Sequence, residues 1–272
     1  MAVRIRRLLI VGVALYLAVC AAMFVLQRRL QYVPDASPLP APAAVGLPGA
    51  VAEGLTTQDG ERLVTWWVAP SDASQPVFLY LPGNGANLVN RARRFERLTA
   101  QGAGLLAVSW RGYGGSSGSP SEAGLMADAG AAYARLAQRV APQRIVIYGE
   151  SLGTTVSVML AAQVPAAALV LDSSFGSALA VAGSAYPWLP VRWLLRDPLR
   201  ADLAAPRVNV PVLQVHCRDD PVIALQFSLR LNELLPQRRP LHIVEARCHV
   251  PSLLQYETAL FDFIGGVMAA QR

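Results

Sequence analysis

The chain has 272 residues, enough to bury a full hydrophobic core, and a formal net charge of +6. All 24 basic residues are arginine, which excludes a P-loop lysine, a Schiff-base lysine and a Ser-Lys dyad. Five of the arginines precede the first acidic residue, Asp35, and the rest of the chain is nearly neutral. The charge pattern therefore predicts a basic N-terminal arm and no nucleic-acid partner.

An uncharged apolar run extends from Leu8 to Leu26. As an α-helix it would be about 28 Å long, close to the thickness of the hydrocarbon core of a bilayer. A cleaved signal peptide has a shorter apolar region and a small-residue cleavage site, whereas this run ends in Gln27-Arg28-Arg29. We expect a retained single-pass anchor within residues 1–34. Three arginines precede the run and two follow it, which predicts a cytoplasmic N-terminus and an exported domain, on the periplasmic or extracytoplasmic side.

The rest of the chain predicts a Pro/Ala-rich spacer, residues 35–50, and one α/β domain, residues 51–272. Strand-like and helix-like segments alternate in this domain, which is typical of a mainly parallel sheet with helices on both faces. A segment rich in Trp, Pro and Leu, at about 175–205, interrupts the alternation and is expected to form a helical cap. The expected strands are 62–68, 77–81, 105–110, 144–148, 168–172, 212–215 and 241–244; the expected helices are 87–100, 122–139, 154–164, one that ends at 234, and 253–268.

The sequence Gly149-Glu150-Ser151-Leu152-Gly153 joins an apolar strand to a helix-like segment. A G-x-S-x-G turn in this context exposes its central serine above the sheet, where a neighbouring base can take the hydroxyl proton. Small residues flank the serine because the turn is cramped. The motif predicts Ser151 as the nucleophile of a serine hydrolase.

An acid and a histidine follow the motif, each in a loop directly after an apolar strand. Asp220 is the predicted acid and His249 the predicted base, and the chain order Ser, Asp, His is the one that this type of turn uses. Asp219 and, less directly, Asp172 are alternative acids. In this mechanism His249 accepts the proton of Ser151, and the acid holds the imidazole in the required tautomer.

Two cysteines lie in these loops, in His216-Cys217 and Cys248-His249. Adjacent side chains seldom converge on one ion, so we predict no metal, and nothing in the sequence calls for a cofactor. His216 and His242 are expected to be structural. Because the acid and histidine loops must meet at one imidazole, we expect Cys217 and Cys248 to lie near each other and to pair if the domain is exported.

Together these residues resemble the α/β-hydrolase superfamily, most closely its membrane-anchored serine hydrolase branch of depalmitoylase-like and lysophospholipid-lipase-like enzymes. Leu79–Asn87 resembles the oxyanion segment of this branch, Trp110–Gly114 the loop after the next strand, and Tyr186–Pro190 the cap. The resemblance implies an α/β-hydrolase fold. It also implies that the backbone N–H groups of Asn84 and Leu152 form the oxyanion hole.

We therefore expect a serine hydrolase that cleaves carboxylic esters or thioesters of acyl or lipid-like substrates without a cofactor. The aromatic side chains of the cap, Trp188 and Trp193 in particular, are expected to line an acyl channel; the alternative is that they only pack the cap onto the domain. One alternative is a serine peptidase of the same fold. The other is a membrane-tethered binding protein without catalytic activity, which an intact Ser151, Asp220 and His249 disfavour.

Overall fold

The computed structural model describes residues 1–85 and 87–271, and its strands form one eight-stranded sheet of order β1-β2-β4-β3-β5-β6-β7-β8. Strands β3 to β8 run parallel, whereas β2 pairs antiparallel with both β1 and β4. The predicted mainly parallel sheet is confirmed. The strands are β1 (Ala50–Thr56), β2 (Arg62–Val68), β3 (Val77–Leu81), β4 (Gly104–Val108), β5 (Ile145–Glu150), β6 (Ala168–Asp172), β7 (Val212–Cys217) and β8 (His242–Val244).

Helices cover both faces of the sheet, because successive side chains of a buried strand point to opposite sides. Leu79 of β3 packs in one cluster with Leu125 of α3 and Val156 of α4. The next residue, Tyr80, packs in the other cluster, with Phe95 of α2 and residues of α9. The helices are α1 (Ala2–Gln31), α2 (Ala92–Thr99), α3 (Glu122–Ala137), α4 (Leu152–Ala161), α5 (Ala178–Ala185), α6 (Val191–Leu194), α7 (Ala201–Ala204), α8 (Leu225–Leu234) and α9 (Glu257–Ala269).

The sheet brings the predicted chemical groups to one edge. Because β3, β5, β7 and β8 are parallel, their carboxyl ends lie side by side, and the loops that leave them carry Asn84, Ser151, Asp220 and His249. In an open α/β sheet this edge is where ligands bind. The fold thus gathers residues that are far apart in the sequence.

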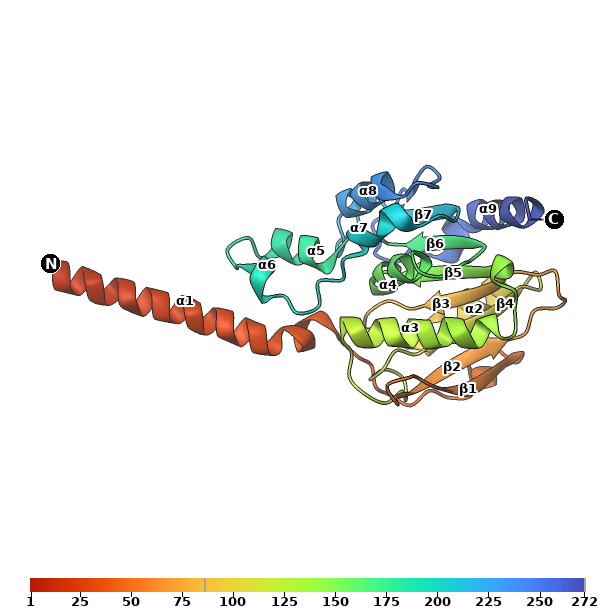
Figure 1. Ribbon diagram of the computed structural model, residues 1–272, viewed down its shortest axis with the longest axis horizontal. Coiled ribbons are helices and arrows are strands. Elements are labelled where there is room, and N and C mark those ends of the chain that lie inside the picture. The colour runs from red at the N-terminus through yellow and green to blue at the C-terminus, as the bar shows by residue number, and fades with distance from the viewer. Residues whose placement is uncertain (86, 272) are drawn as a thin grey trace.

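Helix α1 extends away from the domain, and the short helices α5 and α6 lie beside its C-terminal half at the same end of the sheet (Figure 1). Within the described residues α1 is the one helix long and apolar enough to span a membrane. The segment that follows it, 32–49, is mostly irregular, with one 3₁₀ turn at Pro42–Val45. The predicted cap region contains α5, α6 and α7, so its polypeptide is helical but divided into short pieces.

Candidate active site

Ser151 occupies the turn between β5 and α4, with a positive φ of 48°. This conformation is strained for a residue with a Cβ atom. The flanking glycines are required by crowding, since an added Cβ would lie 2.5 Å from Ser157 Oγ at Gly149 and 2.0 Å from the carbonyl oxygen of Leu81 at Gly153. The start of α4 therefore packs directly on the end of β3, and Ser151 lies at the edge of the sheet.

His249 links Ser151 to Asp220. Its Nε2 atom lies 2.7 Å from Ser151 Oγ, and its Nδ1 atom lies 2.8 Å from Asp220 Oδ2. The second carboxylate oxygen, Oδ1, accepts hydrogen bonds from the backbone N–H groups of Val222 and Ile223 at 2.7 and 2.9 Å. A carboxylate held in this way favours the tautomer with hydrogen on Nδ1 and leaves Nε2 as an acceptor for the serine hydroxyl.

The two alternative acids have other surroundings. Asp219 is exposed, next to the buried side chain of Asp220. Asp172 is fully buried and accepts hydrogen bonds from the side chains of Arg94, Tyr148 and Tyr256. Asp172 thus joins the end of β6 to α2 and to the segment before α9. Of the three carboxylates, Asp220 is the one in contact with His249.

A disulfide joins the two loops that carry the acid and the histidine. Cys217 ends β7, three residues before Asp220, and Cys248 directly precedes His249. The Cα atoms of the two cysteines are 5.6 Å apart. The predicted proximity of Cys217 and Cys248 is confirmed, and their bond fixes the two loops beside the imidazole.

His216 is buried behind the acid. Its Nε2 atom lies 2.9 Å from the carbonyl oxygen of Ile223 and 3.3 Å from Asp220 Oδ2. Burial lowers the pKa of His216 below its ordinary value of 6.5 and outweighs the opposing effects of the hydrogen bond and of Asp220. A neutral His216 with hydrogen on Nε2 donates to Ile223 and so shapes the acid loop. Over residues 1–85 and 87–271, no group of three His, Cys, Asp or Glu residues is placed to hold a metal ion.

A buried ion pair, absent from the sequence prediction, lies beneath the serine. The Glu150 carboxylate is fully buried and pairs with both Arg91 Nε, at 2.6 Å, and Arg91 Nη2, while also accepting from the Tyr80 hydroxyl. Burial alone would raise the pKa of Glu150, but the hydrogen bonds and charge of Arg91 hold that pKa below its usual range. The position of Glu150 at the end of an apolar strand indicates that its charge has a buried cationic partner. The sequence does not indicate which arginine is that partner.

The loop after β3 packs directly on the serine turn. An added Cβ at Gly83 would lie 3.2 Å from Ser151 Cβ. On the other side, Leu152 is the first residue of α4, so its N–H group has no acceptor within the helix. Asn84 and Leu152 therefore belong to two segments that meet at Ser151. Ala86, in the segment that resembles the oxyanion loop, lies outside the described residues.

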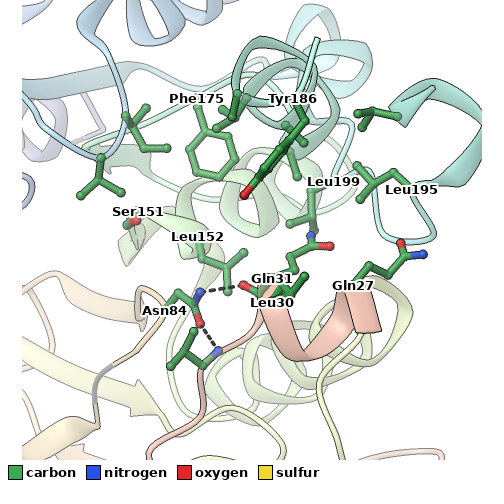
Figure 2. A pocket seen from close by; sticks show the side chains of 18 of the residues that line it. Gln27, Leu30, Gln31, Asn84, Ser151, Leu152, Phe175, Tyr186, Leu195 and Leu199 are labelled. Carbon is green, nitrogen blue, oxygen red and sulfur yellow. Dashed lines mark hydrogen bonds between the residues drawn. The ribbon is translucent and has the colours of Figure 1, made fainter. Parts of the chain in front are cut away.

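The side chain of Asn84 ties this loop to the end of α1. Its amide nitrogen donates to the carbonyl oxygen of Gln31 at 2.7 Å, and its Oδ1 atom accepts from the backbone N–H of Val33 at 2.9 Å (Figure 2). The Tyr113 hydroxyl donates to the same oxygen at 2.6 Å. These contacts connect the N-terminal helix with the loop beside Ser151, a connection that the sequence analysis did not predict.

An apolar cavity of about 730 Å³ opens above Ser151 and His249. Figure 2 shows Ser151, Leu152 and Asn84 on one side of it, Phe175 and Tyr186 of the cap on another, and α1 along a third. Volumes of this size are typical of small-molecule sites. The side chains that line the cavity are mainly Leu, Val, Ala, Met and Phe.

Trp188 and Trp193, expected in the cavity wall, lie outside it. Their side chains are 56% and 79% exposed. In α6 the lining side chains are Val191, Leu194 and the following Leu195, which share one helix face at a spacing of three and four residues, so Trp193 points away. The expectation of an apolar wall from the cap holds for these residues but is wrong for the two tryptophans.

Comparison with known proteins places this site in a family. A family model described as alpha/beta hydrolase fold matches residues 76–202. The uncharacterized protein Rv2307c of Mycobacterium tuberculosis is 41% identical over 233 residues, which are 84% of this chain and 83% of that protein. Lysophosphatidylserine lipase ABHD12 of Danio rerio is 30% identical over 218 residues, which are 73% of this chain and 57% of that protein.

Among solved structures, the Pyrococcus furiosus esterase Pf2001 superposes with a TM-score of 0.69 over 87% of this chain and 99% of that chain, at 18% sequence identity. At this identity the likeness shows the fold alone. Together with the family model and the relatives, it shows that the chain belongs to the α/β-hydrolase superfamily and is a hydrolase.

Proposed function

We propose that the protein is a membrane-anchored serine hydrolase that cleaves carboxylic ester or thioester bonds through an acyl-enzyme. The observation that carries the proposal is the pair of distances at the imidazole, 2.7 Å from His249 Nε2 to Ser151 Oγ and 2.8 Å from His249 Nδ1 to Asp220 Oδ2. A nucleophile, a base and an orienting carboxylate within hydrogen-bonding reach are the arrangement that activates a serine.

In the acylation half-reaction, His249 Nε2 accepts the proton of Ser151 while Ser151 Oγ bonds to the carbonyl carbon of the substrate. Asp220 stabilises the imidazolium that forms. The bond to the leaving oxygen or sulfur then breaks, and the leaving group takes the proton from His249. Water repeats the sequence in deacylation: it gives a proton to His249, attacks the acyl carbon and releases the acid, and Ser151 recovers its hydrogen.

The backbone N–H groups of Asn84 and Leu152 are the proposed oxyanion donors. Their position on the two segments that meet at Ser151 supports this role, as does the start of α4, where the helix dipole favours negative charge. The Asn84 side chain is engaged by α1 and Tyr113, so the contribution of this residue to the oxyanion would come from its main chain.

The apolar cavity supports substrates with an acyl chain. Each methylene buried there contributes about 0.8 kcal/mol, so four additional methylenes raise kcat/KM by roughly 200-fold if their binding is fully realised in the transition state. The family relationship to a protein named as a lysophosphatidylserine lipase points the same way. We therefore infer a preference for medium or long acyl chains over acetyl esters.

Helix α1 supports attachment to a membrane, and the arginine distribution supports a cytoplasmic N-terminus with the hydrolase domain exported. The disulfide between Cys217 and Cys248 agrees with that side, because such bonds persist in oxidising compartments. The lining of the cavity, α1 and the disulfide together support the proposal of an enzyme that works at the outer surface of a membrane on acyl substrates.

The test is reaction of the full chain with a fluorophosphonate probe and hydrolysis of esters from acetyl to palmitoyl, with amide substrates beside them. We expect Ser151→Ala to abolish labelling and to lower kcat by about 10⁶. Ser184→Ala, at an exposed position of α5, is the matched control. Labelling with faster hydrolysis of amides would favour a serine peptidase, and a wild-type chain that neither labels nor hydrolyses any ester would contradict the proposal.

A further inference from the structure

One stripe of α1 forms a wall of the cavity. Met23, Gln27, Leu30 and Gln31 line it, and their spacing places them on one face of the helix. In Figure 2, Gln27, Leu30 and Gln31 lie on the opposite side of the cavity from Phe175 and Tyr186. The helix expected to tether the enzyme is thus also part of the space above Ser151.

Polar side chains in the last two turns of α1, among them Gln27, Arg28 and Gln31, hold this stripe against the cap. Gln27 donates to the carbonyl oxygen of Leu194 at 2.9 Å and accepts from the backbone N–H of Arg196 at 2.6 Å. Arg28 makes a two-point ion pair with Asp197, at 2.7 and 3.0 Å. Because the Asp197 carboxylate is only 3% exposed, it requires a paired cation. These contacts set the spacing between α1 and α6, and with it the width of the cavity.

The cap also lies beside the part of α1 that would be within the membrane. The Tyr16 hydroxyl donates to the carbonyl oxygen of Trp188 at 3.1 Å. Tyr16 precedes Leu26, the end of the uncharged run, by ten residues, a distance of about 15 Å along a helix. The cap segment 178–195 has a single charged residue, Arg192, and exposes Trp188 and Trp193. If α1 spans the membrane, Trp188 and Trp193 lie at the level of its apolar run. Exposed aromatic and apolar side chains at this level are more stable in contact with lipid than with water.

We propose that α1 and the cap together form an acyl-chain site, and that the substrate is an ester lipid whose chain enters from the surrounding leaflet. This inference rests on the proposed function. The occupant is one acyl chain, held between the α1 stripe and the apolar side chains of α5 and α6, with its carbonyl carbon at Ser151 Oγ. In this arrangement α1 determines the chain-length preference of the enzyme as well as its location. The cap lies in the membrane leaflet beside α1.

The α1 wall is tested with full-length enzyme in phosphatidylcholine vesicles and p-nitrophenyl esters from butyrate to palmitate. Leu30→Trp, and Met23→Trp two turns earlier, fill the cavity and should lower kcat/KM for palmitate relative to butyrate by tenfold or more. Val25→Trp is the matched control, because Val25 is 74% exposed and points away from the stripe. Fluorophosphonate labelling confirms that each variant has an intact site. If the wild type and the three variants have the same dependence of kcat/KM on chain length, the proposal that α1 forms a wall of the acyl site is wrong.

Entry of the acyl chain from the leaflet is tested by a measurement that does not depend on enzyme activity. The full-length protein is placed in vesicles of lipids with brominated acyl chains, and quenching of its tryptophan fluorescence is measured. We expect quenching in the wild-type chain and its loss in a variant with Trp188→Phe and Trp193→Phe. Of the other three tryptophans, Trp66 and Trp110 are fully buried, and Trp67 lies in β2 of the domain with its ring covered by Arg139. Quenching that is absent from the wild type, or unchanged in the variant, would overturn entry from the leaflet. A wild-type enzyme without any ester hydrolysis would instead contradict the proposed function.

Discussion

Asp219 and Asp220 are neighbours in the sequence, but their carboxylates have different environments. Asp220 contacts His249 and two backbone N–H groups, whereas Asp219 is exposed. We expect Asp220→Asn to lower kcat by about 10⁴, because the amide favours the wrong tautomer of the imidazole. Asp219→Asn should stay within about threefold of wild type, since it changes only an exposed charge. The measurement is kcat of both variants on one ester. A larger decrease in kcat for Asp219→Asn than for Asp220→Asn would show that Asp219 is the catalytic acid.

His216 makes stability depend on pH. Burial lowers its pKa below 6.5 in the folded chain, so in the window between the two values the unfolded chain binds a proton that the folded chain does not. The free energy of unfolding therefore falls as pH decreases below about 6.5, by up to about 1.4 kcal/mol per pH unit, until the folded pKa is reached. Urea unfolding in detergent between pH 7.5 and 4.5 measures the slope. His216→Asn should reduce it, and an identical slope in this variant would contradict the assignment.

The candidate catalytic side chains were predictable one at a time, because each follows an apolar strand and occurs in a fixed chain order. Two other contacts between distant residues were not predictable. The Glu150 and Arg91 pair spans 59 residues and the contact of Asn84 with Gln31 spans 53, and no local signal identifies Arg91 or Gln31 as the partner. Trp188 and Trp193 show a different error, because aromatic composition alone suggested that they line the cavity. Trp193 lies on the other face of α6, and Trp188 is exposed in the turn before that helix.

At the scale of elements, the disulfide connects the end of β7 with the loop after β8 across 31 residues. By loop-closure entropy a bond of this span contributes about 3–4 kcal/mol to the free energy of unfolding. Cys248→Ala in a Cys217→Ala background should lower the urea midpoint accordingly and also reduce kcat, since both loops position the imidazole. Cys20→Ala, which removes the free cysteine of α1, serves as the control. Equal midpoints for the paired variant and the wild type would show that the bond does not constrain the domain.

Strands were easier to predict than helix starts. The expected ranges 62–68, 77–81 and 168–172 coincide with β2, β3 and β6. Continuous apolar runs mark the buried parallel strands β3 and β6. Strand β2 is antiparallel and only partly buried, and its β-branched and aromatic residues indicate a strand. Strand β1 was not predicted, since its edge position leaves most of its side chains exposed and removes the apolar run. The helix expected from residue 87 begins at Ala92, because Asn87 caps a 3₁₀ turn, Leu88–Arg91, that precedes it.

In the whole molecule, α1 is joined to the hydrolase domain, and its sequence alone predicts no role for it other than that of a membrane anchor. Length and hydropathy predict a membrane span, but they do not indicate that residues about 170 positions later pack on it. Gln27, one of the two glutamines of the stripe, forms its long-range hydrogen bonds with Leu194 and Arg196 of the cap. The packing of α1 on the cap is therefore a property of the folded chain, and in our proposal it couples the location of the enzyme to the substrate that it binds.

The last prediction concerns orientation. Arg4, Arg6, Arg7 and the terminal amine precede the apolar run, and Arg28 and Arg29 follow it, so the positive-inside rule favours export of the domain. In a bacterial host we expect C-terminal alkaline phosphatase fusions to be active and fluorescent-protein fusions to be dark, with a signal ratio on the order of tenfold. Replacing the first three arginines by alanine should lower that ratio, because the bias then reverses. Non-reducing mass spectrometry supplies an independent readout: exported chains should contain the Cys217–Cys248 bond, whereas free thiols in the wild type together with bright fluorescent fusions would place the domain in the cytoplasm.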